Sequence, residues 1–208
     1  MQLPSRGLYA ITSAAICRDT STLLRAVGQA IDGGAVLVQY RDKLNDAAVR
    51  HRNAQQLQAL CRERGVPLLI NDGPAAEVAA AGYDGMHLGE QDGAVAEARR
   101  LCPAAVIGAT CGHALQRALE AQSAGASYVA FGAFYPSATK PLAARAAPEL
   151  LMRARRELQL PLCAIGGITP DNAAPLIAAG AHYIAAVEGV FAAADITAAA
   201  RRYAQLFE

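Results

Sequence analysis

A short apolar run ends in three polar side chains at alternate positions, Gln39, Arg41 and Lys43. If this segment is extended, period-two alternation puts the three side chains on one side. A guanidinium can bind two oxygens at once and an ammonium acts as a point charge, so this side would suit a polyanionic ligand. The alternative is a solvated strand end whose cations pair with Asp42 or Asp46.

Two carboxylates follow the next two apolar runs. Asp72 comes directly after the run at 67–71, and Asp92 follows the run at 85–88. Neighbouring strands lie about 4.8 Å apart, so both carboxylates would face the cations across one opening and suit Mg²⁺ that also binds substrate phosphates. The alternative is that these aspartates cap helices. We expect His87, in the second run, to be a structural hydrogen-bonding residue.

Two later segments also suit phosphate groups. Ser137, Thr139 and Lys140 place two hydroxyls and an ammonium within four residues, and Lys140 and Lys43 are the only lysines among 19 basic residues. The glycine pair 166–167 would expose backbone N–H groups before a helix, which lets an anion approach closely. Two separate anion sites at one opening imply two phosphorylated substrates.

Short apolar runs rich in β-branched residues alternate with stretches of helical length. The runs predict strands at Gly7–Thr12, Ala35–Arg41, Pro67–Asn71, Gly85–Leu88, Val106–Thr110, Ser127–Gly132, Leu162–Gly166 and Tyr183–Val187. The stretches between them predict helices at Thr22–Gly33, Asp46–Arg64, Pro74–Ala81, Val95–Leu101, Leu115–Gly125, Pro148–Leu158, Asp171–Gly180 and Ile196–Phe207. The sequence Thr169-Pro170-Asp171 predicts the N-cap and first turn of the seventh helix.

Eight strand–helix units in 208 residues predict an α/β protein: a single (β/α)8 TIM barrel that forms one domain over residues 1–208. An open doubly wound sheet is the alternative. In such barrels the catalytic groups come from the carboxyl ends of the strands and the loops that follow, which is where the polar residues above fall.

Composition excludes several classes of partner. The formal net charge is +1, which gives no electrostatic footprint for nucleic acid. We expect no membrane segment, because no apolar run approaches the length of a bilayer span, and the N-terminus lacks a signal-peptide core. The five cysteines form no CxxC pair, which suits a reducing cytoplasm.

Six motifs occur in order over essentially the whole chain. They are Gly7-Leu8-Tyr9-Ala10-Ile11-Thr12, Gln39-x-Arg41-Asp42-Lys43, Asn71-Asp72, Asp84-Gly85-x-His87-Leu88-Gly89-x-x-Asp92, Pro136-Ser137-x-Thr139-Lys140 and Ile165-Gly166-Gly167-Ile168. With this set the chain resembles the thiamine-phosphate synthase family. The resemblance implies a magnesium-dependent (β/α)8 transferase of thiamine biosynthesis, and relatives suggest a homodimer.

The reaction implied by the resemblance joins 4-amino-2-methyl-5-(diphosphomethyl)pyrimidine to 4-methyl-5-(2-phosphoethyl)thiazole, giving thiamine phosphate and pyrophosphate. Its mechanism would be dissociative: the pyrimidine amino group feeds electrons to the methylene carbon, the C–O bond breaks, and the thiazole nitrogen attacks the cation. No side-chain nucleophile is needed. We expect Cys111, beside Thr110, to be a packed and inert thiol.

The resemblance also implies roles for residues at the pyrimidine. Gln39, Arg41 and Lys43 would hold the pyrimidine diphosphate, and Asn71 would contact the pyrimidine end. Thr110 falls at the small hydroxyl position beside the reacting centre. The resemblance thus implies four catalytic residues: Arg41, Lys43, Thr110 and Lys140.

The resemblance assigns Mg²⁺ to Asp72 and Asp92. Ser137, Thr139 and Lys140 would bind the departing pyrophosphate, with Ser137 replacing the usual threonine. Gly167 and the backbone of Val187 and Glu188 would receive the thiazole phosphate.

Glu188 departs from the family pattern, because many relatives carry a serine whose hydroxyl contacts the thiazole phosphate. A carboxylate there would repel the phosphate unless it turns away or pairs with an arginine. Two alternative functions remain: a thiazole tautomerase-like isomerase of the same superfamily, and a non-catalytic barrel that binds phosphorylated ligands. The diphosphate-binding residues argue against the isomerase, and only an assay separates the non-catalytic barrel from an enzyme.

Overall fold

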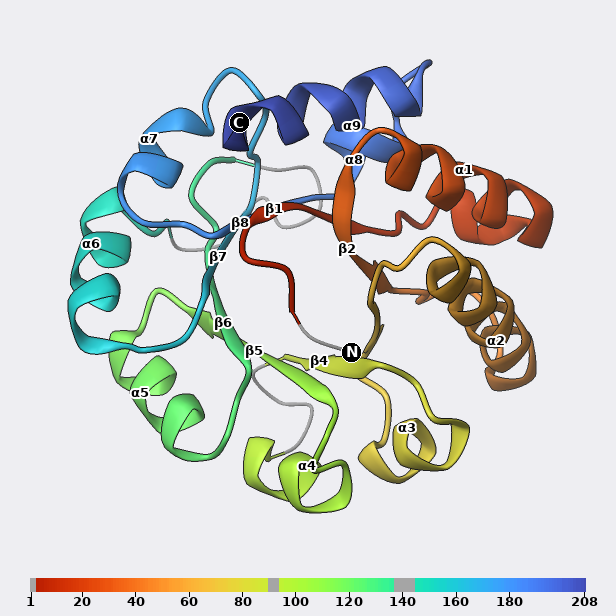
Figure 1. Ribbon diagram of the computed structural model, residues 1–208, viewed down its shortest axis with the longest axis horizontal. Helices are drawn as coiled ribbons and strands as arrows, with labels where there is room; N and C mark the ends of the chain where they lie inside the picture. The colour runs from red at the N-terminus through yellow and green to blue at the C-terminus, as the bar shows by residue number, and fades with distance from the viewer. Residues whose placement is uncertain (1–2, 90–93, 137–144) are drawn as a thin grey trace.

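The computed structural model describes residues 3–89, 94–136 and 145–208 and contains a closed barrel of parallel strands in the order β1 to β8 (Figure 1). The strands are β1 Gly7–Ile11, β2 Ala35–Tyr40, β3 Leu68–Asn71, β4 Gly85–Leu88, β5 Val106–Gly112, β6 Tyr128–Phe131, β7 Leu162–Ile165 and β8 Tyr183–Ala186. The prediction of a (β/α)8 barrel is confirmed, and β8 pairs with β1 to close it.

Helices surround the barrel and follow the strands in turn (Figure 1). They are α1 Thr20–Asp32, α2 Ala47–Glu63, α3 Ala75–Ala81, α4 Val95–Leu101, α5 Leu115–Ser123, α6 Pro148–Glu157, α7 Ala174–Ala178, α8 Glu188–Phe191 and α9 Ile196–Ala204, with 3₁₀ turns η1 Ile16–Arg18 and η2 Gln205–Phe207. Aspartate side chains cap α1, α2 and α9 by accepting from backbone N–H groups of the first turn.

Strand alternation divides the core into two layers. In β2, Val38 and Tyr40 pack outward with the layer under the helices, whereas Leu37 packs with the residues inside the barrel. Gln39 has the same parity as Leu37 and is 2% exposed, so it also lies inside. This alternation decides which polar side chains reach the barrel interior.

Three tyrosines fill much of that interior. Tyr9, Tyr128 and Tyr183 are at most 1% exposed, and the Tyr128 ring meets the other two edge-on, with centroids 5.9 and 6.1 Å away. Gly108 of β5 makes room for Tyr128, because an added Cβ would lie 2.2 Å from the Cζ of that ring. A glycine inside a strand therefore has a packing reason here.

The seventh helix begins later than the sequence predicts. Residues 169–172 form a turn in which Asn172 Oδ1 accepts from Thr169 N at 2.8 Å, and α7 starts only at Ala174. The prediction that Thr169 caps a helix from Asp171 is wrong, because the Asn172 side chain closes a separate turn first. The sequence analysis also missed α8, whose four residues are too short for a periodicity signal.

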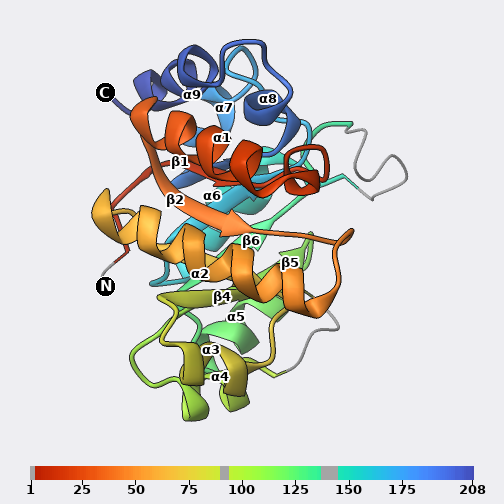
Figure 2. The ribbon, with the colours of Figure 1, turned by 90° about the vertical axis from the view of Figure 1, so that its right-hand side faces the viewer.

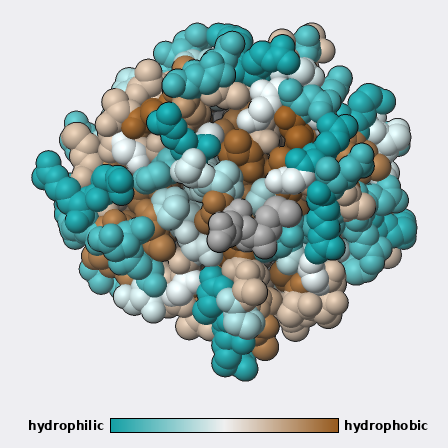
Figure 3. Space-filling view, viewed as in Figure 1, coloured by the Kyte–Doolittle hydropathy of each residue, from teal (hydrophilic) through white to brown (hydrophobic). Residues whose placement is uncertain are grey.

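The two ends of the barrel differ in chemistry. Figure 2 shows the strands running from the end near both termini toward the opposite end, where the loop after β2 lies. Figure 3 views the first end, where hydrophilic residues predominate around the rim and hydrophobic residues show between them. A hollow of about 370 Å³ near the strand starts is lined by small and apolar residues, among them Pro4, Val36, Val66 and Pro67, so it offers no side-chain chemistry. Within the described ranges, no helix is long and apolar enough to cross a membrane.

Candidate active site

Asp42 organises the loop that follows β2. Its carboxylate is buried and accepts from Tyr40 Oη at 2.8 Å, from the backbone N–H groups of Leu44 and Asn45 at 2.9 and 3.1 Å, and from Asn45 Nδ2 at 2.8 Å. Burial alone would raise the pKa of Asp42, but the hydrogen bonds from Asn45, Leu44 and Tyr40 outweigh it and lower the pKa. The carboxylate therefore stays ionised and shapes the turn at residues 43–45.

This turn ends the strand earlier than expected. β2 stops at Tyr40, so the premise of an extended segment through Lys43 is wrong. Asp42 accepts from neighbours within its own loop, and Asp46 caps α2 through Val49 N at 2.8 Å. Within the described residues, these contacts of Asp42 and Asp46 therefore do not support the alternative in which they pair with the cations of the strand end.

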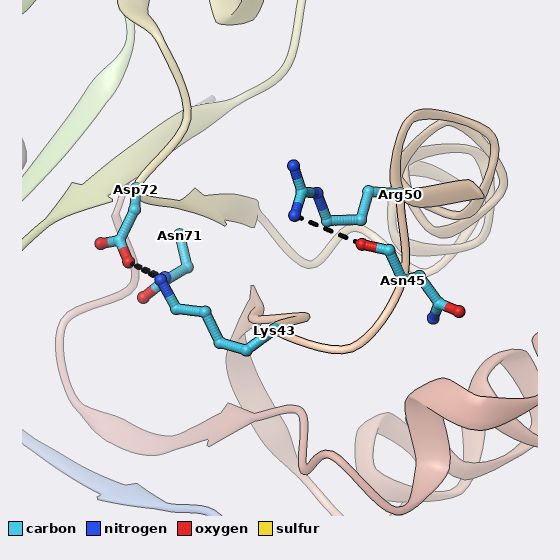
Figure 4. A network of polar contacts seen from close by, with 5 residues as sticks. All are labelled: Lys43, Asn45, Arg50, Asn71 and Asp72. Atoms are coloured by element: carbon cyan, nitrogen blue, oxygen red, sulfur yellow. Dashed lines mark hydrogen bonds and ion pairs between the residues drawn. The ribbon is translucent and has the colours of Figure 1, made fainter. Parts of the chain in front are cut away.

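Arg41 and Lys43 make different contacts in the loop after β2. The Arg41 backbone is fixed by the Thr12 hydroxyl, which accepts from Arg41 N at 2.8 Å and donates to Arg41 O at 3.0 Å, and its side chain is half-buried. Lys43 instead reaches across to the loop after β3, where its Nζ lies 2.6 Å from Asp72 Oδ2 (Figure 4). The Lys43 side chain is 53% exposed, so this pair positions charges rather than stabilising the fold by more than about 1 kcal/mol.

Asp72 sits in an unusual backbone conformation. Its φ is +53°, in the left-handed region that aspartate tolerates better than most residues. Asn71 Nδ2 donates to the same Oδ2 at 2.5 Å, so two donors converge on one carboxylate oxygen (Figure 4). The N-cap of α3 is Pro74 with no side-chain cap, which excludes helix capping as the role of Asp72. Strained backbone at a polar opening is typical of functional sites.

A chain of hydrogen bonds runs through the barrel interior. Gln39 Nε2 lies 2.5 Å from Tyr9 Oη, which lies 2.8 Å from Tyr128 Oη. Tyr128 Oη is 2.7 Å from His87 Nδ1, and His87 Nε2 is 2.8 Å from Thr110 Oγ1. The interior thus connects Gln39 of β2 with Thr110 of β5, two residues that the sequence analysis assigned to the substrate independently.

Burial keeps the members of this chain neutral. It lowers the pKa of His87 to about 4, against a smaller opposing effect of the Asp72 carboxylate. Burial also raises the pKa of Tyr9 and Tyr128 above the ordinary range. His87 is 7% exposed and stacks on Tyr128 with centroids 5.6 Å apart. The expectation of a structural hydrogen-bonding histidine is confirmed, although its partner Thr110 is itself a candidate site residue.

The loops after β6 and β7 begin side by side. Tyr135 N donates to Gly166 O at 2.9 Å, and Tyr135 Oη donates to Asn172 O at 2.9 Å. Gly167 has φ +63°, and an added Cβ there would lie 2.2 Å from Pro136 O. Only glycine fits this close approach, so the glycine pair holds the β7 loop against the stem of the β6 loop.

Val187 and Glu188 follow β8. Val187 is half-buried and packs at the interior layer, and Glu188 begins α8 with an exposed side chain. An exposed carboxylate can turn into solvent, which meets the first of the two conditions under which Glu188 and a phosphate are compatible. Cys111 is 1% exposed, so the expectation of a packed thiol is confirmed.

Four expected site residues lie outside the described residues: Asp92, Ser137, Thr139 and Lys140. Among the residues that the structure does describe, no group of three or more His, Cys, Asp or Glu side chains could hold a metal ion. The described part of the site therefore consists of the β2 loop cations, Asp72 with Asn71, the interior chain, and the glycine pair.

Sequence reasoning missed the interior tyrosines. Tyr9 and Tyr128 carry the contacts between Gln39 and His87, yet neither tyrosine was given a role of its own from the sequence, although Tyr9 lies within one of the six motifs. A tyrosine at an interior position of a predicted barrel strand is a usable signal, because a buried hydroxyl needs a partner.

Fold and site together define a (β/α)8-barrel protein whose opening carries cations, a carboxylate and a buried polar chain. Comparison with known proteins gives the family. The model of the thiamine monophosphate synthase family matches residues 8–190. A thiamine-phosphate synthase from Methylococcus capsulatus is 51% identical over 210 residues, covering 100% of this chain and 92% of the relative.

Two further comparisons agree. A thiamine-phosphate synthase from Aromatoleum aromaticum is 52% identical, covering 98% of this chain and 97% of the relative. Among solved structures, a thiamine phosphate pyrophosphorylase from Pyrococcus furiosus has a TM-score of 0.86 at 28% identity, covering 97% of this chain and 95% of that one. The chain belongs to the thiamine monophosphate synthase family, as its motifs predict.

Proposed function

We propose that this chain condenses 4-amino-2-methyl-5-(diphosphomethyl)pyrimidine with 4-methyl-5-(2-phosphoethyl)thiazole, releasing pyrophosphate and thiamine phosphate. The proposal is supported by family membership and by full-length relatives named for this activity. The observation that carries it is the approach of Lys43 Nζ to Asp72 Oδ2 at 2.6 Å, since it brings a cation and a carboxylate from different strands to one opening. A diphosphate with a bound divalent ion needs both charges.

The β2 residues would bind the pyrimidine diphosphate. Arg41 offers a planar guanidinium for two phosphate oxygens, and Lys43 offers a point charge. Gln39 and Thr110 would contact this substrate from the two ends of the interior chain, with Asn71 at the pyrimidine end. The firm backbone anchor of Arg41 on Thr12 supports a positioning role for the loop.

Asp72 fits a magnesium ion by its chemistry. Mg²⁺ takes oxygen ligands and is often held by one or two carboxylates together with substrate phosphates, so a cluster of three protein ligands is not required. Lys43 Nζ and Asn71 Nδ2 both donate to Asp72 Oδ2 and so hold this carboxylate in place. Asp92 is the second proposed ligand. When bound, Mg²⁺ would supply charge neutralisation on the diphosphate oxygens.

The residues of the chain would favour departure of pyrophosphate without forming a covalent intermediate. Arg41 and Lys43 would stabilise the negative charge that grows on the leaving group, an effect that is strongest at preorganised sites. The barrel would hold the two rings in line so that the thiazole nitrogen meets the pyrimidine methylene carbon. The buried Cys111 thiol is not needed as a nucleophile.

The second phosphate and the leaving group have separate proposed sites. Gly167 and the backbone of Val187 and Glu188 would receive the thiazole phosphate; Gly167 has φ +63°, a backbone conformation that glycine adopts readily. Ser137, Thr139 and Lys140 would bind the released pyrophosphate. We take residues 1–208 as one functional domain that works in the cytoplasm on small phosphorylated substrates, with a homodimer as the proposed assembly.

The test mixes purified protein, Mg²⁺ and both substrates, and measures thiamine phosphate and pyrophosphate. We expect both products in equal amounts, neither product when one substrate is omitted, and a severe loss of turnover in Arg41→Ala. Ligand binding without pyrophosphate would instead indicate a non-catalytic barrel. Conversion of a thiazole tautomer without coupling would indicate the isomerase.

A further inference from the structure

The interior hydrogen-bond chain has a direction that can be worked out from its donors and acceptors. At its first link the Gln39 amide nitrogen donates to Tyr9 Oη at 2.5 Å. The only partners of the Tyr9 hydroxyl within the described residues are Gln39 and Tyr128, and Tyr9 is 1% exposed. Because a buried hydroxyl proton needs an acceptor, Tyr9 donates to Tyr128 at 2.8 Å.

The same reasoning continues to the histidine. Tyr128 is fully buried and already accepts from Tyr9, so its own proton goes to His87 Nδ1 at 2.7 Å. Nδ1 is then an acceptor and carries no proton. The neutral ring must therefore carry its proton on Nε2, which donates to Thr110 Oγ1 at 2.8 Å.

We propose that Tyr9, Tyr128 and His87 are positioning residues that hold the Thr110 hydroxyl as a hydrogen-bond donor toward the opening, where it meets an acceptor atom of the pyrimidine diphosphate. This inference rests on the proposed function. Thr110 Oγ1 receives the proton of His87, so its own proton is left to point elsewhere, and the half-buried Thr110 side chain lies at the carboxyl half of β5. At the other end, Gln39 has its Nε2 bonded to Tyr9 and keeps its carbonyl oxygen as an acceptor.

Packing around the interior hydrogen-bond chain fixes the direction of its hydrogen bonds. Gly108 leaves the space that the Tyr128 ring occupies, and the stacked His87 ring fixes the approach of Nδ1 to Oη. For Thr110 to donate to His87 instead, the ring proton would have to move from Nε2 to Nδ1, the hydroxyls of Tyr128 and Tyr9 would have to turn, and the Gln39 amide would have to flip. The site therefore selects an acceptor on the substrate, either an unprotonated ring nitrogen or a phosphate oxygen.

The direct test is the position of the proton on His87, read without substrate. The protein has four histidines, and ¹⁵N labelling of histidine with long-range ¹H–¹⁵N correlation distinguishes the two ring nitrogens of each. His87→Gln assigns the resonances by their loss. We expect an unprotonated Nδ1 and a protonated Nε2 near neutral pH; a proton on Nδ1 would overturn the inference.

A kinetic test uses two buried tyrosines. Tyr128→Phe keeps the ring but removes the donor to His87, and we expect a KM for the pyrimidine diphosphate raised about tenfold with the KM for the thiazole phosphate unchanged. Tyr183→Phe is the matched control, because the Tyr183 hydroxyl donates to Pro4 O away from this chain. A folded Tyr128→Phe with both KM values of the wild type would contradict a positioning role, whereas a purely structural role would lower stability and kcat instead.

Binding of pyrophosphate identifies the acceptor. If Thr110 donates to a phosphate oxygen, Tyr128→Phe should weaken pyrophosphate binding about tenfold, as it does the KM. If Thr110 donates to the ring nitrogen, Tyr128→Phe should bind pyrophosphate as the wild type does. Both results support the inference. If the protein forms thiamine phosphate but His87 carries its proton on Nδ1, the inference is refuted and the proposed function is not. Absence of turnover would refute the proposed function, while the spectrum still reports the direction of the chain.

Discussion

Replacing Asp42 with alanine tests whether the β2 loop is held in place by one buried carboxylate. Asp42 accepts four hydrogen bonds, from Tyr40, Leu44 and twice from Asn45, and its side chain carries no substrate role in this account. The substitution removes all four acceptors and leaves Arg41 and Lys43 in the sequence. Any effect on substrate affinity must therefore come from their positions.

The expected magnitude follows from which donors lose all partners. Tyr40 is 4% exposed, and its hydroxyl would be left buried without an acceptor, at a cost of about 1–3 kcal/mol. The N–H groups of Leu44 and Asn45 lie nearer solvent, so water replaces part of what they lose. We expect a total loss of about 2–3 kcal/mol of the free energy of unfolding, a large share of typical domain stability.

The assay combines urea unfolding with the KM for the pyrimidine diphosphate. Asp46→Ala is the control from the same loop, since it removes the N-cap of α2 and costs about 1 kcal/mol without touching the turn. We expect a KM raised about tenfold in Asp42→Ala and unchanged in Asp46→Ala. An Asp42→Ala protein with wild-type stability and KM would refute this reasoning.

Three further outcomes are expected. Gly108→Ala would place a Cβ 2.2 Å from the buried Tyr128 ring and should cost about 3 kcal/mol in urea unfolding, whereas Gly28→Ala, with open space in α1, should be neutral or stabilising; equal effects would contradict the packing argument. Burial lowers the pKa of His87 to about 4, so this histidine is protonated near pH 6.5 in the unfolded protein but only near pH 4 in the folded protein. The free energy of unfolding should therefore fall by up to about 3 kcal/mol between pH 6.5 and pH 4. Urea unfolding at several pH values measures this fall, which should be smaller in a His87→Gln variant. Glu188→Ser should leave the KM for the thiazole phosphate unchanged or lower it, and a large increase would reveal a positive role for the carboxylate.

Much of the fold could be predicted because its signals are local. The β4 and α4 bounds match the prediction residue for residue, since an apolar run and a helical period mark them directly. The β2 strand ends one residue early because the Asp42 side chain binds its own loop, and α7 starts late because Asn172 does the same after β7. Side-chain hydrogen bonds to nearby backbone compete with regular structure, and the hydrophobic pattern does not register them.

The candidate site was predicted in part for a different reason. The positions of the strand ends suffice to predict that Lys43 and Asp72 lie at one opening, although β2 stops before Lys43, and the structure brings the two side chains into contact. The link from Gln39 to Thr110 depends on which tyrosine hydroxyls meet inside the closed barrel. Tyr9 and Tyr128 are 119 residues apart, and their contact follows from barrel closure rather than from any spacing in the sequence.

The central claim is that the cations of the β2 loop bind the diphosphate at the opening they share with Asp72. Calorimetric titration of pyrophosphate in Mg²⁺ into the wild type, Arg41→Ala and Lys43→Ala measures this directly. The control is Arg64→Ala, which removes a surface ion pair with Asp32. We expect binding about tenfold weaker in each of the two loop variants and unchanged in the control. Wild-type affinity in both loop variants would contradict it.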